Sequence, residues 1–450
     1  MQKNEVLTLT VDSFSSEAEG VCRHQGQVVF VPGALPGEQI KALIVKTQKT
    51  HAYGKLLEII APSERRQTPP CPYYPRCGGC GTQHMSYGTE LQMKRQHVRD
   101  ALERIGGLDV EVPEVIGMET PLHYRNKTSQ PVTLLHGEPV VGFYERRSHR
   151  VIATEECLIA MPQSDKAAGI VTAWMKACVV APHDEENHSG LVRHVMTRVN
   201  HLGECMVTLI INGETLPRQE ELIAALSRDL PGFLSLCVSL NTQRGNTILG
   251  SGYRTLWGEE RLKDRLCGFD FSLSPLSFFQ INRTQTETLY YEALEMSKVN
   301  PDDLVIDLYC GAGTISSLFA SKCREVIGIE IVPQAIEDAR ENAKRNGIGN
   351  IRFIQGAAET LMPQLADEGY RPDIIVLDPP RKGAAPEVLA AIAEASPEKI
   401  VYVSCNPATQ ARDAKILCEA GYRASACQSV DMFCATPDVE NILLFERAIP

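Results

Sequence analysis

The sequence predicts an α/β chain in three parts: a small N-terminal β-barrel, a mixed α+β central region and a C-terminal doubly wound α/β domain. Three observations support this division. Short strands broken by glycine and proline come first, a proline-rich connector with clustered cysteines follows, and from about residue 270 apolar strands alternate with amphipathic helices. We place the domains at residues 1–61, 62–270 and 271–450, a division that the length of the chain allows.

The N-terminal segment has the pattern of a small barrel. Apolar and β-branched stretches lie at residues 6–14, 26–47 and 53–60, and glycine- and proline-containing turns separate them. Several short strands in so few residues favour a closed, OB-like architecture, which often binds nucleic acid.

The central region combines strands and helices. We predict a helix from about Thr89 to Ile105, a hairpin turning at Leu202–Gly203 and an amphipathic helix within residues 217–230. These elements by themselves indicate no chemistry.

The C-terminal part alternates strand and helix. Continuous apolar strands are expected within residues 304–310, 325–331, 373–380 and 399–405, as in a parallel sheet that is buried on both faces. A helix beginning at Pro333 and ending before Gly347 shows the usual placement of these two residues at helix ends.

Composition bounds the function. With 43% hydrophobic and 22% charged residues the chain is globular, and collagen-like and low-complexity classes are excluded. No signal peptide and no membrane-spanning run is visible, so we expect a cytoplasmic protein without a membrane partner. We also expect a monomer, although the sequence does not determine the oligomeric state.

The formal net charge of −11 means that an RNA partner would need a local basic patch. One candidate runs from Lys41 to Arg76, where seven lysines and arginines face two acids, Glu58 and Glu64. This excess favours RNA binding by the barrel.

A cofactor loop is predicted at Asp307–Thr314, where a strand ends and a helix begins. Gly311 and Gly313 would let a cofactor approach the backbone closely, and Glu330, 23 positions after Asp307, would bind ribose hydroxyls from the next strand end. Ser316 replaces the third glycine of the dinucleotide fingerprint. This departure disfavours NAD and suits S-adenosylmethionine, which has no pyrophosphate.

Three cysteines are clustered as Cys71-x5-Cys77-x2-Cys80 in a proline- and glycine-rich loop. Thiolates so spaced can converge on one metal centre, with a fourth ligand from elsewhere in the chain. The spacing alone does not separate an iron–sulfur cluster from a four-cysteine zinc site.

Two later motifs are more specific. They are DPPRKG at residues 378–383 and SCNPATQARD at residues 404–413. Together with FFQIN at 278–282 and the DLYCGAGT loop, they resemble the RNA uridine-5-methyltransferase family, in particular its bacterial 23S ribosomal RNA members with a TRAM domain and an iron–sulfur cluster. The resemblance covers nearly the whole chain. It implies that the N-terminal barrel is a TRAM domain and that the C-terminal domain is a Rossmann-like methyltransferase.

The resemblance also implies the chemistry. Cys405 would be the nucleophile that adds to carbon 6 of uracil, which makes carbon 5 nucleophilic toward the methyl group of S-adenosylmethionine. Glu440 would then remove the carbon-5 proton before the thiolate is eliminated. The sequence departs from the family pattern near this base, where Cys434 and Asp438 replace the usual proline and histidine. A solvated acid before the last strand is the alternative interpretation of Glu440.

The resemblance assigns the remaining site residues. Gln280, Tyr309, Glu330 and Asp378 match the family's S-adenosylmethionine contacts, and Gly311, Gly313 and Thr314 complete the cofactor loop. Cys157 would be the fourth ligand of a 4Fe–4S cluster held by Cys71, Cys77 and Cys80, with a structural role. Arg381 and Lys382 would meet RNA phosphates or belong to the plain surface.

Four alternatives remain open. A transfer-RNA 5-methyluridine enzyme is disfavoured because such relatives generally lack the TRAM domain and the cluster. An RNA 5-methylcytidine enzyme would also use a cysteine, whereas an exocyclic-amine methyltransferase would need none. From a different class, the chain would be an iron–sulfur RNA-binding protein with an inactive methyltransferase fold.

Overall fold

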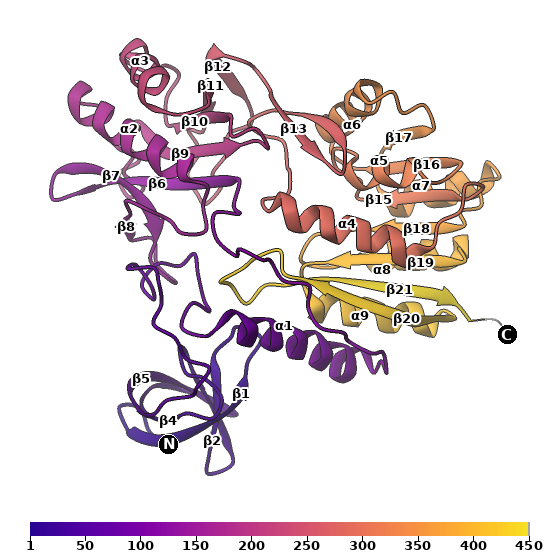
Figure 1. The fold of residues 1–450 in the computed structure, drawn as a ribbon, viewed down its shortest axis with the longest axis horizontal. Helices are drawn as coiled ribbons and strands as arrows, with labels where there is room; N and C mark the ends of the chain where they lie inside the picture. The colour runs from indigo at the N-terminus through magenta and orange to yellow at the C-terminus, as the bar shows by residue number, and fades with distance from the viewer. Residues whose placement is uncertain (449–450) are drawn as a thin grey trace.

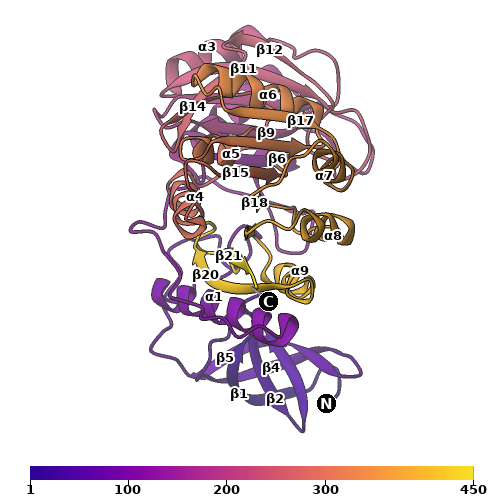
Figure 2. The same ribbon diagram turned by 90° about the vertical axis from the view of Figure 1, so that its right-hand side faces the viewer.

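The computed structural model describes residues 1–448. It contains an N-terminal barrel, a central seven-stranded sheet and a C-terminal seven-stranded sheet, so the predicted fold class is confirmed (Figure 1). The barrel lies at one end of the molecule, and α1 (Tyr87–Ala101) lies between it and the C-terminal sheet (Figure 2).

The barrel closes in the order β1-β2-β3-β5-β4. Alternate residues of β1, among them Leu7, Leu9 and Val11, point inward and join the apolar core, because successive side chains of a strand face opposite sides. Its strands are β1 (Val6–Phe14), β2 (Gly20–His24), β3 (Gln27–Val31), β4 (Gln39–Thr47) and β5 (His51–Ala61).

The central sheet has the order β12-β11-β10-β9-β6-β7-β8. Its strands are β6 (Lys127–Leu135), β7 (Glu138–Tyr144), β8 (Val151–Ala153), β9 (Val192–Val199), β10 (Cys205–Ile211), β11 (Phe233–Leu240) and β12 (Tyr253–Gly258). The helices α2 (Pro162–Cys178) and α3 (Gln219–Asp229) pack on one face. The predicted hairpin at Leu202–Gly203 joins β9 to β10, and α3 is the predicted amphipathic helix.

The C-terminal sheet has the order β17-β16-β15-β18-β19-β21-β20, and all its strands are parallel except β21, which runs antiparallel to both of its neighbours. Its strands are β15 (Leu304–Leu308), β16 (Glu325–Glu330), β17 (Ile351–Gln355), β18 (Ile374–Leu377), β19 (Lys399–Ser404), β20 (Tyr422–Val430) and β21 (Glu440–Arg447). The strand order reverses between β15 and β18. In doubly wound folds ligands bind at such a switch point, beyond the carboxyl ends of the strands.

Helices cover both faces of this sheet. One face carries α7 (Ala358–Asp367), α8 (Pro386–Ala395) and α9 (Pro407–Glu419), and the other carries α4 (Arg283–Ser297), α5 (Thr314–Ala320) and α6 (Pro333–Arg345). The strands between them are buried on both sides, as their continuous apolar sequences predict.

Two segments N-terminal to residue 271 also pack on this layer. The predicted helix near residues 89–105 is α1 followed by a π-helical turn, η1 (Leu102–Gly106), and its apolar side chains join those of α9. The hairpin β13 (Leu262–Leu266)–β14 (Phe269–Leu273) packs with α4 and α5. Both segments therefore add apolar side chains to the cores on the two faces of the C-terminal sheet.

Central and C-terminal layers are joined by buried polar contacts. The Arg198 guanidinium, on the second face of the central sheet, donates to the Ser277 carbonyl at 2.6 Å, and the Asn126 amide donates to the Gln280 carbonyl at 3.0 Å. These bonds hold the segment that contains the predicted cofactor residue Gln280. No helix within residues 1–448 has the length and apolar character needed to cross a membrane.

Candidate active site

Cys405 lies in the turn between β19 and α9. The next residue, Asn406, caps α9: its side-chain oxygen accepts hydrogen bonds from the backbone N–H groups of Ala408 and Thr409. Its amide nitrogen donates to the Arg381 carbonyl at 3.0 Å. The motif that follows the cysteine therefore fixes the turn, and it places the half-exposed thiol just before a helix N-terminus, where a thiolate is stabilised.

Glu440 is the first residue of β21 and lies opposite Cys405. The antiparallel register pairs Ser404 with Asn441, so the residues one step further along each strand, Cys405 and Glu440, come to the same edge of the sheet. The Gln410 amide secures this pairing, because it donates to the carbonyls of Tyr402 at 2.9 Å and Asn441 at 3.1 Å. The predicted nucleophile and base, 35 positions apart in the chain, are thus brought together.

Asp378 completes this group from the end of β18. Burial raises its pKa to about 7. Burial, together with the neighbouring Asp378, also raises the pKa of Glu440, and one Glu440 oxygen is buried without a hydrogen-bond partner. The pKa of Cys405 is raised to about 11 by burial and by Glu440, while Arg381 acts to lower it.

Arg381 is the cation beside this group. Its guanidinium pairs with Asp438 at 3.1 Å and lies close enough to Cys405 for a hydrogen bond to the sulfur. Lys382, its neighbour in the sequence, is exposed. Asp438, one of the two departures from the family pattern, therefore holds the guanidinium near the thiol.

The predicted cofactor loop lies at the switch point of the sheet. Tyr309 and Gly311 have positive φ values of 64° and 54°, and the Gly311 N–H donates to Glu330 at 3.3 Å. Gly313 has a φ of 79°, and a Cβ at this position would lie 2.8 Å from the Phe353 ring. The loop therefore needs glycine at 313, and it directs its backbone toward the carboxylate of Glu330.

One residue of this crevice was missed from the sequence. Tyr290, on α4, is buried and lies 3.3 Å from the Thr314 hydroxyl, within hydrogen-bonding reach of Gln280 and near Asp378. It therefore connects site residues that come from three separate segments. Its position in an ordinary amphipathic helix gives no sequence signal for such a role.

The charges of the crevice suit a cationic cofactor. Burial raises the pKa of Asp307 to about 7, and the nearby Asp378 and Glu330 add to this effect. Carboxylates gathered at the ends of neighbouring strands favour a positively charged guest. The sulfonium of S-adenosylmethionine is such a cation, whereas a dinucleotide pyrophosphate would add negative charge.

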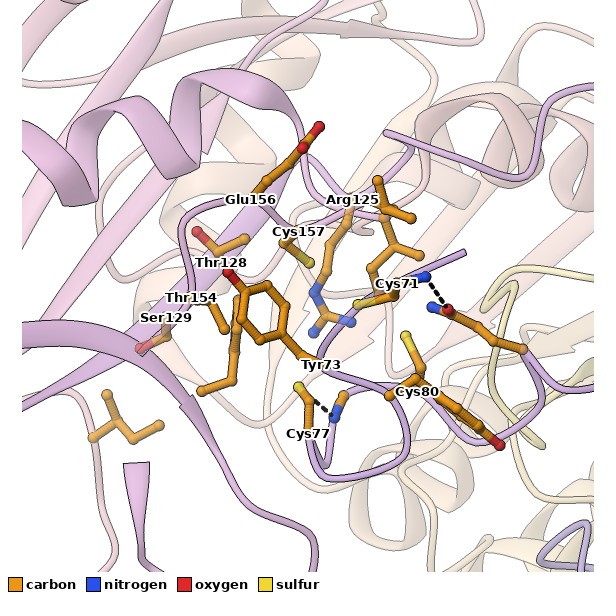
Figure 3. A pocket seen from close by; sticks show the side chains of 17 residues that line it. Cys71, Tyr73, Cys77, Cys80, Arg125, Thr128, Ser129, Thr154, Glu156 and Cys157 are labelled. Carbon is orange, nitrogen blue, oxygen red and sulfur yellow. Dashed lines mark hydrogen bonds between the residues drawn. The ribbon is translucent and has the colours of Figure 1, made fainter. Parts of the chain in front are cut away.

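The four predicted metal ligands meet in the central part of the molecule. Cys71, Cys77, Cys80 and Cys157 line one cavity of about 300 Å³ (Figure 3). Figure 3 shows their thiols around a shared space, with Arg125 and Tyr73 beside it. Within residues 1–448, however, no three such side chains stand where they would hold a single metal ion together.

The four cysteines of this cavity are only partly exposed. Burial raises the pKa of Cys80 to about 12 and that of Cys157 to about 11. Free buried thiols would therefore stay protonated, and thiolates would require compensating positive charge, such as that of a metal centre. The donor set and the size of the cavity fit a centre of several atoms.

Comparison with known proteins gives two family matches. The model of the tRNA (uracil-5-)-methyltransferase family matches residues 86–448, and the TRAM domain model matches residues 2–57. The chain is 44% identical to an RNA methyltransferase of Clostridium tetani over 99% of this chain and 97% of the relative. It is 42% identical to one of Halalkalibacterium halodurans, over 99% and 98%.

A solved structure also resembles the whole chain. It is the Pyrococcus abyssi tRNA (uracil-54, C5)-methyltransferase in complex with S-adenosyl-L-homocysteine, with a TM-score of 0.79, 26% sequence identity, and coverage of 97% of this chain and 99% of that one. The TRAM match places that domain on the closed barrel. The chain belongs to the tRNA (uracil-5-)-methyltransferase family and is an S-adenosylmethionine-dependent RNA methyltransferase.

Proposed function

We propose that this enzyme methylates carbon 5 of a uridine in 23S ribosomal RNA, in the cytoplasm, with Cys405 as nucleophile and Glu440 as base. The observation that supports this most is the strand register that sets Cys405 opposite Glu440 at the edge where Asp378 also ends a strand. Neither a thiol nor a second acid at this place is needed to methylate an exocyclic amine.

The reaction proceeds in three steps. The Cys405 sulfur bonds to carbon 6, and the electron pair of the 5,6 double bond moves onto the uracil ring. S-adenosylmethionine supplies the methyl group: carbon 5 bonds to the methyl carbon, the bond between that carbon and the sulfonium sulfur breaks, and S-adenosylhomocysteine leaves. Glu440 then takes the carbon-5 proton, the electron pair of that bond restores the double bond, and the bond between sulfur and carbon 6 breaks.

The environment of each group suits its step. The Arg381 guanidinium and the N-terminus of α9 both stabilise the Cys405 thiolate, which opposes the effect of burial. The raised pKa of Glu440 makes its carboxylate a stronger base, because the protonated form is favoured once the proton arrives. A uracil inside a duplex could not reach this pocket, so the target base is single-stranded or flipped out.

Transfer RNA is the second candidate substrate. The Pyrococcus abyssi tRNA enzyme matches this chain over 97% of its length, so the presence of the barrel does not by itself separate the two substrate classes. Contrary to the expectation from the sequence, the TRAM domain therefore does not count against a transfer-RNA substrate. The four-cysteine cavity is the remaining feature that favours ribosomal RNA.

We assign RNA binding in the barrel to one row of outward-facing aromatic and lysine side chains that runs across β3, β5 and β4. Phe30 on β3 pairs with Tyr53 on β5, and Tyr53 pairs with Lys46 on β4. His51 adds a third aromatic ring, 5.3 Å from that of Tyr53. Aromatic rings beside lysines on an OB-like barrel are typical of surfaces that stack single-stranded bases and contact phosphates.

We further infer that Cys71, Cys77, Cys80 and Cys157 hold a 4Fe–4S cluster. Each cysteine of such a cluster binds a different iron, so the sulfurs stand farther apart than around one zinc ion. The shared 300 Å³ cavity, which has room for a centre of several atoms, favours the cluster over zinc. The methyl transfer needs no redox step, so its role is structural.

The first prediction concerns the nucleophile. RNA that contains 5-fluorouridine has no carbon-5 proton to lose, so the enzyme and S-adenosylmethionine should trap a denaturation-resistant protein–RNA adduct. Cys405→Ala should abolish the adduct, whereas Cys418→Ala, on the neighbouring helix, should retain it. Mapping the adduct in 23S ribosomal RNA and in transfer RNA identifies the substrate. Methyl transfer to ordinary RNA without any adduct would contradict the uridine mechanism.

The second prediction concerns pH. Because Arg381 lowers the pKa of Cys405, Arg381→Gln should raise it, and adduct formation should slow by about tenfold near neutral pH. The rate should recover as the pH rises and the thiolate forms. Arg381→Lys should slow adduct formation less than Arg381→Gln does, and Lys382→Gln should form the adduct at the wild-type rate. An equal loss at every pH would mean that Arg381 does not act through the thiol.

The third prediction concerns the metal centre. Protein purified without oxygen should contain iron and sulfide in equal amounts and absorb visible light, and Cys157→Ser should lower both contents. Cys178 is a partly exposed cysteine outside the cavity, so Cys178→Ser should change neither the iron nor the sulfide content. Zinc in place of iron would support the single-ion alternative.

The fourth prediction concerns the barrel. Lys46→Gln combined with Lys49→Gln should weaken RNA binding and reduce the dependence of log K on log salt by roughly one for each lost phosphate contact. Lys41→Gln is the control, because Lys41 already pairs with Glu58 at 2.8 Å. If Lys41→Gln weakened RNA binding as much per lysine as the double variant does, the surface around Phe30, Tyr53 and Lys46 would be excluded as the binding surface.

A further inference from the structure

The segment that precedes Glu440 rests on the loop that contains three of the four cysteines. We name residues 431–439 the base loop and residues 71–82 the cysteine loop. The backbone N–H groups of Gly81 and Thr82 both donate to the Ala435 carbonyl, at 2.7 and 3.2 Å. A Cβ at Gly81 would lie 3.1 Å from the Pro437 ring. The two loops are therefore in direct contact, with no space for a larger residue.

A buried carboxylate on α1 binds both loops. Glu90 accepts a hydrogen bond from the Thr82 hydroxyl at 2.8 Å and another from the Ala435 N–H at 2.8 Å. Lys94, fully buried, donates to Glu90 at 2.8 Å and also pairs with Asp431 at the start of the base loop. An unpaired charge at this depth would cost several kcal/mol, so the three groups hold one another in place.

Apolar packing joins the same two loops. Cys434 is fully buried and packs in one cluster with Tyr124, Ile159, Cys80 and Cys157. The Tyr124 hydroxyl donates to the Cys434 carbonyl at 2.9 Å. Two thiols of the 300 Å³ cavity are therefore in the packed cluster that supports the base loop.

Glu440 depends on this support more than Cys405 does. One of its carboxylate oxygens has no hydrogen-bond partner, so its position follows that of the backbone that carries it, which is the first position of β21, paired with Val430 and directly continuous with the base loop. Cys405, in contrast, is held by the cap of α9 and the turn around it. Displacement of the base loop would therefore move the base and leave the backbone of Cys405 in place, and it would affect the thiol only indirectly, through Asp438 and the Arg381 guanidinium.

We propose that the cysteine loop is the positioning element for the base, so that disturbing its residues Gly81 and Thr82 slows proton removal from carbon 5 much more than it slows thiolate addition, which the loop reaches only through Asp438 and Arg381. This inference rests on the proposed function. Its consequence is specific: when the contact is disturbed, Cys405 still bonds to carbon 6 and carbon 5 still receives the methyl group. Elimination is then slow, and RNA remains covalently attached to Cys405.

The experiment uses ordinary uridine RNA, S-adenosylmethionine and the full chain. Gly81→Val should slow the release of methylated RNA by about tenfold, as expected for a small displacement of a catalytic group, while adduct formation changes less than about twofold. The denaturation-resistant adduct should therefore accumulate. Gly79→Ala, whose Cβ would make an ordinary 3.6 Å contact with the Cys77 sulfur, should behave like the wild type.

Two further variants keep the outcome decisive. Thr82→Val removes the hydroxyl bond to Glu90 with little change in shape and should accumulate adduct even where Gly81→Val does not fold. Glu440→Gln is the reference: if it accumulates no adduct, the proposed function fails and this inference with it. If Glu440→Gln accumulates adduct and neither loop variant does, the inference alone is overturned.

A measurement independent of activity tests whether the cysteine cavity supports the base loop. Cys157→Ser should increase deuterium uptake by the backbone of residues 431–439 by severalfold, because it disturbs the cluster in which Cys434 packs. Uptake in β19 should stay unchanged. Unchanged uptake in the base loop, or an equal increase throughout the C-terminal domain, would overturn the inference.

Discussion

The antiparallel pairing of β21 with β19 is the constraint on which the active site depends. The other strands of the C-terminal sheet that surround the crevice are parallel, and their carboxyl ends contribute Asp307, Glu330 and Asp378. An antiparallel strand presents its beginning, not its end, at that edge. The register Ser404↔Asn441 therefore brings the first residue of β21, Glu440, beside the residue that follows β19, Cys405. A slip of one residue would turn the base to the opposite face of the sheet.

Electrostatics explain why this arrangement needs its ligands. Carboxylates and a thiol share a buried crevice, and burial favours their neutral forms. A sulfonium cation offsets this cost, and Arg381, held by Asp438, does so on the side of the nucleophile. For Glu440 burial outweighs the opposing effect of Arg381, and under the proposed mechanism the raised pKa makes its carboxylate a stronger proton acceptor.

Cys434 and Asp438, which differ from the usual family residues, both make contacts near the active site. Cys434 fills the buried position at which the base loop packs against Cys80 and Cys157 of the cysteine cavity, and Asp438 anchors Arg381. Both lie in the segment whose far end carries the base. The distance in sequence between the cysteine loop and Glu440 conceals how directly one supports the other, since Gly81 and Ala435 share a hydrogen bond.

The sequence by itself determined the fold class, because apolar periodicity and the placement of glycine and proline depend on neighbours within one element. It also indicated Cys405, Glu440, the cofactor loop and the four cysteines, because their motifs are local or resemble a known family. Only the tertiary structure decided that α1 packs against α9, that Tyr290 lies beside Thr314, that Lys41 is neutralised by Glu58, and that the cysteine loop contacts the base loop. These depend on contacts between residues far apart in the chain, and single-sequence patterns contain no information about such pairs.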